Sequence, residues 1–424
     1  MGLPERAEAD RARGGPLAAV LVVAAGLLAI GLTRDWRLLH EDNGAFQTTI
    51  ALSHLKAGLA TTRAHDVLTD RNTGERSVYG HHPPGLGLLL AGAFALAGSA
   101  QPAVARTTVI LFHLGTLLVL HRTLLLLLGR AGALAGTFFL AVVPMAAYFG
   151  RMVNYEPVCL FAVSLQLLGW TAYAGAGGRR WLAVLGLGIV LGALVDWPAF
   201  FFALALALVS LPGAIGGDRR ARAALAVCVA AGAGMAALDL LHLRWAAGGS
   251  LEALSSAVRQ NVEAGAGRES LLDLLEMHFD SFRRYYTHAG TVACAAAALA
   301  AARPRGRLGA ALLPHLDGAL VRRFLLATGL AAGGYVAVAP SWSGVHPYWK
   351  FYFLPFAAAA VGLALVLLRR LGGRAPRVVL WVLSAELLLA SAYQLRLRHT
   401  REGAYAIETT ARIRAERLRP SDWR

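Results

Sequence analysis

The chain has 424 residues, of which 57% are hydrophobic and only 16% are charged, and its mean hydropathy is +0.53. Soluble domains carry about a quarter charged residues and have shorter apolar runs. The composition therefore excludes a soluble globular protein and favours membrane-spanning helices, whose backbone satisfies its own hydrogen bonds. The net charge of +16 does not indicate a nucleic-acid partner, because the basic residues lie in short turns between apolar runs.

The first apolar run covers residues 16–32 and follows Arg6, Arg11 and Arg13. The sequence after this run, "GLTRDW", lacks the small-residue cleavage site of a signal peptide. We therefore expect a retained first span, with residues 1–15 in the cytoplasm.

Further apolar runs follow at 84–99, 103–128, 131–149, 157–174, 181–195, 198–216, 222–241, 288–302, 323–339, 351–368 and 376–393. If all of them crossed, the Arg-rich turns would lie outside, against the positive-inside rule. Run 84–99 is short, begins after Pro83 and contains several glycines, so we expect it not to cross. The sequence thus predicts an all-α polytopic membrane protein with about 11 transmembrane helices (at most about 12).

This topology makes residues 16–393 one transmembrane domain. It places residues 33–83 and 242–287 in two long external loops, which we expect to carry amphipathic helices at the membrane surface. Residues 394–424 then form a short C-terminal tail, expected outside.

Five polar segments cannot be explained as the ends of membrane spans. All five fall on the predicted external side. They are "HEDN" at 40–43, "VYGHHPPG" at 78–85, "FGRMVNYEP" at 149–157, "VDWP" at 195–198 and "SGVHPYWK" at 343–350. Ionisable side chains near membrane depth are costly and often functional. The five segments therefore predict a site just above the bilayer.

Several of these residues also have a structural explanation. Asp42 and Asn43 could cap a helix, and Asp196 could cap the helix that begins near Pro198. Arg151 could form a local ion pair with Glu156.

The histidine and lysine motifs have alternatives of the same kind. His81 and His82 could form a solvated turn before two prolines. His346, Tyr348 and Lys350 could anchor the chain at the interface, although a lysine is also a suitable cation for a lipid phosphate.

No specific metal motif is present, although "HED" and the later His81–His82 could together form a site, so a divalent cation stays an open alternative. Cys159, Cys228 and Cys294 lie far apart in apolar runs and indicate no disulfide framework. The sequence contains no Gly-rich phosphate loop, so nothing indicates nucleotide use.

Sugar transfer from a lipid-carried donor fits these residues. A carboxylate must act as general base on the acceptor hydroxyl, and cations must stabilise the departing phosphate. One base attacking opposite the leaving group gives inversion. We therefore expect Asp42 to be the base, with Glu41 as its neighbour or substitute. Donor phosphate or sugar contacts are expected from His81, His82, Arg151, Glu156, His346, Tyr348 and Lys350.

A family resemblance agrees with this interpretation. The segments "HEDNGAFQTTIALSHLKAGL", "YGHHPPGLGLLLAGAFALAG", "AYFGRMVNYEPVCLFAVSL", "VDWPAFFF" and "HPYWKFYFLPFAAAA" resemble, in this order, bacterial members of glycosyltransferase family 39. That family contains dolichyl-phosphate-mannose–protein mannosyltransferases and lipid A aminoarabinose transferases, within the GT-C superfamily. The resemblance implies a GT-C-type bundle, a polyprenyl-phosphate-linked sugar donor, and a protein, lipid or polysaccharide acceptor.

Within this resemblance, Asp42 matches the family's catalytic Asp, and Asn43 stands where a Glu is usual. His82 stands where the family's "HKPP" element has Lys, and Glu156 lies near the second acidic position. Pro347 stands where similar sequences often carry an acid.

Two other functions are alternatives to glycosyl transfer. A polyprenyl-linked sugar transporter or flippase would need inverted repeats and charges buried within spans, and the apolar runs here are almost free of acids. A non-catalytic membrane scaffold would leave the polar segments unexplained. We therefore expect an enzyme of the cell inner (plasma) membrane that acts at the external, periplasmic side.

Overall fold

The computed structural model describes residues 15–69, 73–252, 254–255, 259, 270–302, 317–338 and 340–417. This part of the chain is almost entirely helical. Its one sheet is a small antiparallel hairpin of β1 (Val67–Thr69) and β2 (Arg76–Val78), with Val67 opposite Val78. The predicted all-α fold is confirmed.

The helices coincide with the apolar runs and the loop segments between them. They are α2 (Gly15–Leu28), α3 (Asp42–Ala57), α4 (Leu59–Thr62), α5 (Gly85–Ala97), α6 (Pro102–Val142), α7 (Pro144–Phe149), α8 (Tyr155–Ala176), α9 (Arg179–Ala193), α10 (Pro198–Ile215), α11 (Arg219–Ala246), α13 (Leu271–Ala302), α15 (Gly318–Val338), α16 (Pro340–Val345), the 3-10 helix η1 (Pro347–Phe353), α17 (Leu354–Leu371), α18 (Arg374–Thr400) and α19 (Ala404–Arg417).

Among the described residues, 7 helical segments are long and apolar enough to cross a membrane: α6, α8, α10, α11, α15, η1 with α17, and α18. The chain is therefore a multi-pass membrane protein. The run expected not to cross corresponds to α5, which has only 13 residues. The total of about 11 crossings stays a prediction.

Helix α6 turns back on itself at Gly129. This residue has φ 72° and ψ −178°, a backbone conformation that glycine adopts without steric cost. His121 Nδ1 and Thr137 Oγ1 lie 2.9 Å apart although 16 residues separate them, whereas a straight helix would place them about 24 Å apart. The two antiparallel helices expected from the runs 103–128 and 131–149 are thus present.

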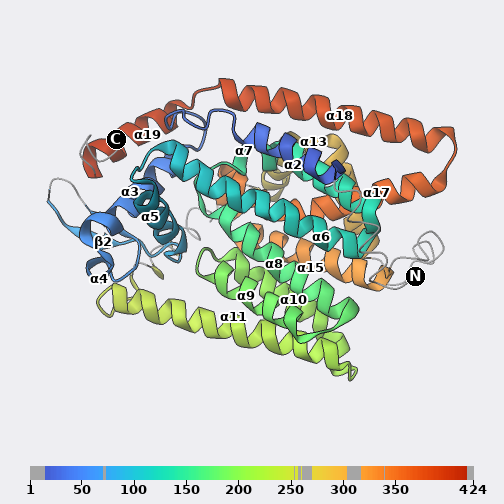
Figure 1. Ribbon diagram of the computed structural model, residues 1–424, viewed down its shortest axis with the longest axis horizontal. Helices are drawn as coiled ribbons and strands as arrows, with labels where there is room; N and C mark the ends of the chain where they lie inside the picture. The colour runs from blue at the N-terminus through green and yellow to red at the C-terminus, as the bar shows by residue number, and fades with distance from the viewer. Residues whose placement is uncertain are drawn as a thin grey trace.

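The loops gather at one end of the bundle. In Figure 1, α18 and α11 border the molecule, and α3, α4, α5, the β hairpin and α19 lie together at the left end. We call this the polar end and define it by residues 33–69, 73–83, 149–157, 195–198, 340–353 and 400–403. The described Arg-rich turns, near residues 130, 179, 220 and 370, lie away from it (Figure 1). There, Arg220 donates to the Gly175 carbonyl across two turns (3.2 Å).

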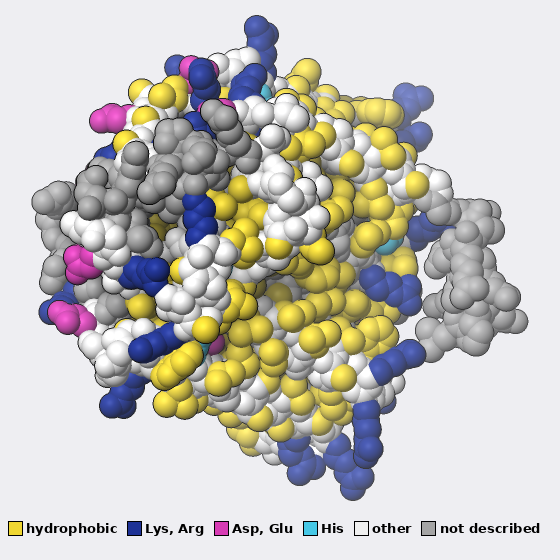
Figure 2. Space-filling view, turned by 60° about the vertical axis from the view of Figure 1, so that its left-hand side comes forward, with side chains coloured by type: hydrophobic (Ala, Val, Ile, Leu, Met, Phe, Trp, Pro, Cys, Tyr) yellow, Lys and Arg dark blue, Asp and Glu magenta, His cyan; other side chains and the backbone are white. Residues whose placement is uncertain are grey.

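The molecular surface fits a bilayer. Figure 2 shows a broad hydrophobic area with Lys and Arg side chains towards both margins. On α18, Trp381 is 76% exposed and Leu389 is 72% exposed. An apolar area of this extent would be unfavourable in water and is expected to face lipid.

One loop segment differs from its expected placement. We expected α3 to lie along the membrane surface, but most of its side chains from Gly44 to His54 are buried and it packs against α5 and α19. The expected C-terminal tail contains α19. It joins the first loop through a backbone bridge between Leu38 and Glu402 and an ion pair between Arg414 and Asp35 (2.7 Å).

Close helix packing gives a test of this arrangement. A Cβ atom at Gly136 would lie 2.5 Å from the Ala358 carbonyl oxygen on α17. The variant Gly136→Ala is therefore expected to lose about 1–3 kcal/mol of stability and to melt at a lower temperature in detergent. The matched control is Gly92→Ala on α5, because nothing lies within 4 Å of its added Cβ. Equal melting temperatures for the two variants would contradict this packing.

Candidate functional site

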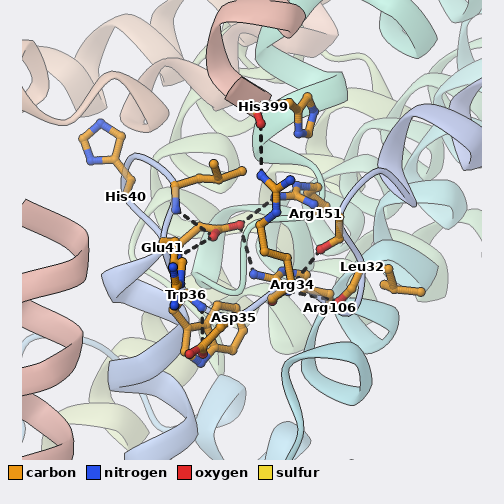
Figure 3. A network of polar contacts seen from close by, with 12 residues as sticks. Leu32, Arg34, Asp35, Trp36, His40, Glu41, Arg106, Arg151 and His399 are labelled. Atoms are coloured by element: carbon orange, nitrogen blue, oxygen red, sulfur yellow. Dashed lines mark hydrogen bonds and ion pairs between the residues drawn. The ribbon is translucent and has the colours of Figure 1, made fainter. Parts of the chain in front are cut away.

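A buried ion-pair network organises the polar end. Glu41 Oε1 accepts hydrogen bonds from Arg106 Nη2 (3.0 Å) and Arg151 Nη2 (2.6 Å). Glu41 Oε2 accepts from the backbone N–H groups of Arg37 (3.1 Å) and Leu38 (3.0 Å). The three charged side chains are 7%, 1% and 2% exposed, respectively, so the carboxylate and both guanidinium groups are withdrawn from solvent. Figure 3 shows them converging on Glu41.

The same arginines bind the end of α2 and the segment that follows it. Arg106 donates to the carbonyls of Leu32 (3.0 Å) and Arg34, and Arg151 donates to the carbonyl of Ile30. The network thus fastens residues 30–41 to α6 and to the turn after α7. Sequence reasoning missed Arg106, and the available signal was an arginine near the start of the apolar run 103–128.

This geometry favours positioning roles for Glu41 and Arg151 over the substrate contacts expected from the sequence. Both oxygens of Glu41 are already engaged, which leaves little capacity to accept an acceptor proton. Arg151 pairs with Glu41, not with Glu156 as in the local alternative. Glu156 is itself buried, and its Oε2 has no hydrogen-bond partner in the described part of the chain.

Asp42 differs from its neighbour. It is the first residue of α3, and within the described structure its Oδ1 is buried without a hydrogen-bond partner. Burial raises the pKa of Asp42, while a hydrogen bond from its own backbone N–H acts in the opposite direction. The N-cap position of α3 belongs to Glu41, so the alternative that Asp42 is the cap residue does not hold. Asp42 is therefore a carboxylate with an open oxygen and increased basicity.

Aromatic side chains and imidazoles form a cluster near the start of α3, where His40 precedes Asp42 by two residues. The Tyr348 hydroxyl lies 2.9 Å from His346 Nδ1, and the Tyr348 ring packs edge-on against His40 at 5.3 Å. Burial lowers the pKa of His346 to about 4. Burial, with nearby His346 and Arg398, lowers the pKa of His40 to about 3. Both imidazoles are therefore neutral at neutral pH and can offer hydrogen bonds but no positive charge.

His82 belongs to a second cluster at the polar end. Its Nδ1 lies 2.8 Å from Asp196 Oδ1, and its ring stacks on Tyr155 at 4.0 Å. Asp196 Oδ2 accepts from the Tyr352 hydroxyl (2.9 Å). Asp196 also accepts from the backbone N–H of Trp197 (2.8 Å), which is the N-cap residue of α10. Asp196 therefore connects η1, α10 and the "HHPP" segment, which is more than the capping role considered from the sequence.

Two other predicted phosphate ligands have different surroundings. The His81 ring stacks on Tyr79 at 4.9 Å, and burial together with neighbouring His82 lowers the pKa of His81. The Lys350 side chain is fully buried, and its Nζ donates to the carbonyl of Ser343 (2.6 Å). Lys350 thus holds the turn before η1, and this contact disfavours the phosphate contact expected from the sequence.

The five polar segments do come together. Glu41 binds Arg151, His82 binds Asp196, and Tyr348 packs against His40. A pair that sequence reasoning missed, His54 and Asp66 (3.3 Å), is buried beside them. No group of three or more His, Cys, Asp or Glu side chains within the described ranges is arranged to hold a metal ion.

A cavity of about 340 Å³ lies beside His40. Its walls come from the first loop, from α13, from the turn before η1 and from the end of α18. The lining residues are Leu39, His40, Met277, Asp280, Ser281, Arg284, Tyr285, Gly344, Pro347 and Arg398. The cavity gives a substrate space next to the start of α3.

Removing the charge of Glu41 tests its positioning role. Glu41→Gln would leave two buried guanidinium groups without their carboxylate, and we expect a loss of about 3–5 kcal/mol in stability, seen as a lower melting temperature in detergent. Asp42→Asn serves as control and should melt close to the wild type, because Asp42 holds no ion pair among the described residues. A Glu41→Gln protein of normal stability would argue against this role.

Comparison with known proteins supports the fold and the family resemblance. The family model described as Dolichyl-phosphate-mannose-protein mannosyltransferase matches residues 81–240. This range begins at His81 and ends within α11, and over it the resemblance expected from the sequence is confirmed. No curated protein matches the sequence.

Solved structures share the architecture. The apo oligosaccharyltransferase of Archaeoglobus fulgidus matches with a TM-score of 0.60 at 13% identity, covering 90% of this chain and 56% of that chain. ArnT from Cupriavidus metallidurans bound to undecaprenyl phosphate matches with a TM-score of 0.60 at 14% identity, covering 94% and 70%. AglB from A. fulgidus, in complex with an inhibitory peptide and a dolichol-phosphate, gives 0.51 at 14% identity, covering 91% and 56%.

These likenesses establish a GT-C-type fold, as the sequence predicted. The chain spans about half the length of the archaeal oligosaccharyltransferase (56%).

Proposed function

From this fold and the family match over residues 81–240, we propose that the protein is an inverting glycosyltransferase. It moves a sugar from a polyprenyl-phosphate donor to an acceptor hydroxyl of a protein, lipid or polysaccharide. The observation that carries the proposal is Asp42, a carboxylate of raised pKa with an open buried oxygen, which follows the cavity-lining residue His40 by two positions. A buried base of increased basicity suits proton abstraction near neutral pH.

The reaction needs one displacement. The acceptor hydroxyl gives its proton to the Asp42 carboxylate while its oxygen attacks the anomeric carbon of the sugar. The bond from that carbon to the phosphate oxygen breaks, and its electron pair leaves with the polyprenyl phosphate. The proton then passes from Asp42 to solvent. Attack opposite the leaving group inverts the anomeric configuration.

The other residues of the site have separate roles in positioning the chain and in binding the substrates. Glu41, with Arg106 and Arg151, fixes the segment that leads into α3. Neutral His40 and His346, with the Tyr348 hydroxyl, are suited to hydrogen-bond uncharged sugar or acceptor hydroxyls. His81 and His82 stay candidates for the donor, and Asp196 holds His82 in a fixed orientation.

The fold and the charge pattern support a lipid donor and an outward-facing site. ArnT has been solved with undecaprenyl phosphate and AglB with a dolichol-phosphate, and such donors place their phosphate at the membrane interface. The Arg-rich turns lie away from the polar end, which by the positive-inside rule faces outside. The enzyme therefore works at the external face of the cell inner membrane. A transporter is not favoured, because the buried charges lie at one end of the bundle.

Replacing the base gives the central test. Asp42→Asn is expected to lower the rate of sugar transfer by about 10²–10⁴-fold, the usual contribution of a general base, while the protein keeps its lipid. Transfer would be followed with synthetic polyprenyl-phosphate sugars, and the co-purified lipid by mass spectrometry. Asp218→Asn is the matched control, because Asp218 caps α11 and Asn caps a helix equally well. Unchanged transfer in Asp42→Asn would remove Asp42 from the mechanism.

The pH dependence of transfer should report the same group. The base acts only when ionised, and its pKa is raised above 3.8. Activity should therefore fall with decreasing pH, on a limb centred above the ordinary value for Asp. The measurement is kcat/KM against pH for the wild type and for Asp42→Glu, in which the midpoint of the limb should move. An acidic limb that is identical in both proteins would assign it to another residue.

A further inference from the structure

Most cations expected to bind the donor phosphate are engaged elsewhere. Arg151 is bound to Glu41, Lys350 to the Ser343 carbonyl, and His82 to Asp196. A departing phosphate nevertheless needs positive charge close by. The question is which side chains at the polar end supply it.

Accessible arginines occur at the end of α18. The cavity beside His40 adjoins a second one of about 280 Å³, and Leu39, Arg284 and Arg398 line both. Arg401 also lines the second cavity. Its side chain has no ion pair with any described residue.

The charge in these cavities is positive. Asp280 is bonded to Arg283 (2.7 Å) as well as to Arg284 (2.5 Å), and Glu402 lies 3.7 Å from Arg37. Both acids therefore already have a partner, which leaves Arg398 and Arg401 in excess. The Arg398 guanidinium lies 4.7 Å from the Tyr285 ring, and its Nε is buried without a hydrogen-bond partner in the described structure.

Backbone contacts hold the C-terminal end of α18 against residues 37–39 of the first loop. Gly403 N–H donates to the Arg37 carbonyl (2.9 Å), and Leu38 pairs with Glu402. A Cβ atom at Gly403 would lie only 3.2 Å from Leu39 Cα, so the two backbones touch. Leu39 precedes Asp42 by three residues. The two arginines are thereby fixed beside the segment that leads into α3.

The position of the cavities also fits a lipid. Helix α18 exposes large hydrophobic side chains such as Trp381 and Leu389 along its length, and it ends at Thr400. Arg398 and Arg401 thus lie where the helix leaves the apolar zone, which is the level of lipid phosphates. Leu39 and Leu397 add apolar lining to the second cavity.

We propose that Arg398 and Arg401 bind the phosphate of the lipid-linked donor and stabilise it as it leaves. The proposal rests on the proposed function and names its phosphate ligands. Planar guanidinium groups match phosphate oxygens with paired hydrogen bonds and keep their charge at every physiological pH. The donor's sugar then extends through the cavity beside His40 towards Asp42, and its polyprenyl chain follows the surface of α18.

The test is lipid binding by purified protein in detergent. Undecaprenyl phosphate is the probe, and native mass spectrometry or tryptophan fluorescence gives its Kd. The double variant Arg398→Gln/Arg401→Gln is expected to raise the Kd about 10-fold or more, because it loses hydrogen bonds between charged groups and the phosphate. Arg396→Gln is the matched control, because Arg396 is exposed on the same helix, about 200° away around its axis from Arg398.

Two further arms separate the possible outcomes. Inorganic phosphate should displace undecaprenyl phosphate from the wild type, which identifies the phosphate group as the recognised chemistry; failure to compete would contradict it. Asp42→Asn should bind the probe normally while transferring sugar about 10²–10⁴-fold more slowly. If the double variant and Arg396→Gln bind alike while Asp42→Asn still loses transfer, the phosphate assignment fails and the proposed function stands. If Asp42→Asn transfers normally, the proposed mechanism fails instead.

Discussion

The polar end depends on one interaction, the capture of the Glu41 carboxylate by two buried arginines. Arg106 comes from α6 and Arg151 from the turn after α7, and burying either cation without a counter-ion would be strongly destabilising. Because both guanidinium groups also bind carbonyls at the end of α2, a single carboxylate fixes three parts of the chain. Asp42 follows directly and owes its position to this anchor, while its own oxygen stays open.

The adjacent acids Glu41 and Asp42 thus have different surroundings. Glu41 has a structural role, and Asp42 has the proposed chemical role. Both oxygens of Glu41 accept hydrogen bonds, whereas Asp42 keeps one open oxygen and burial raises its pKa. The same contrast holds for the cations. Lys350 and Arg151 are buried against carbonyls or a carboxylate, while the guanidinium groups at the end of α18 line the cavities.

Much of the fold follows from the apolar runs and from the positions of the arginines between them. These features predicted the helices, the turn near Gly129 and the loops that meet at one end of the bundle. The convergence of the segments around residues 41, 82, 151, 196 and 348 was also predictable, because polar residues at membrane depth need one another. Individual partners were not. Nothing in the sequence shows that Lys350 turns inward to Ser343, since this follows from the path of η1. Likewise, only tertiary contacts bring residues 398–403 beside Leu39.

The pairing of the first loop with the last described helices has a consequence for biogenesis. Residues 35–38 hold Glu402, Gly403 and Arg414, so this region can mature only after ribosomes have delivered residues 402–414. A nascent chain arrested before α18 would insert its earlier helices while the loop that carries Asp42 still lacks these contacts.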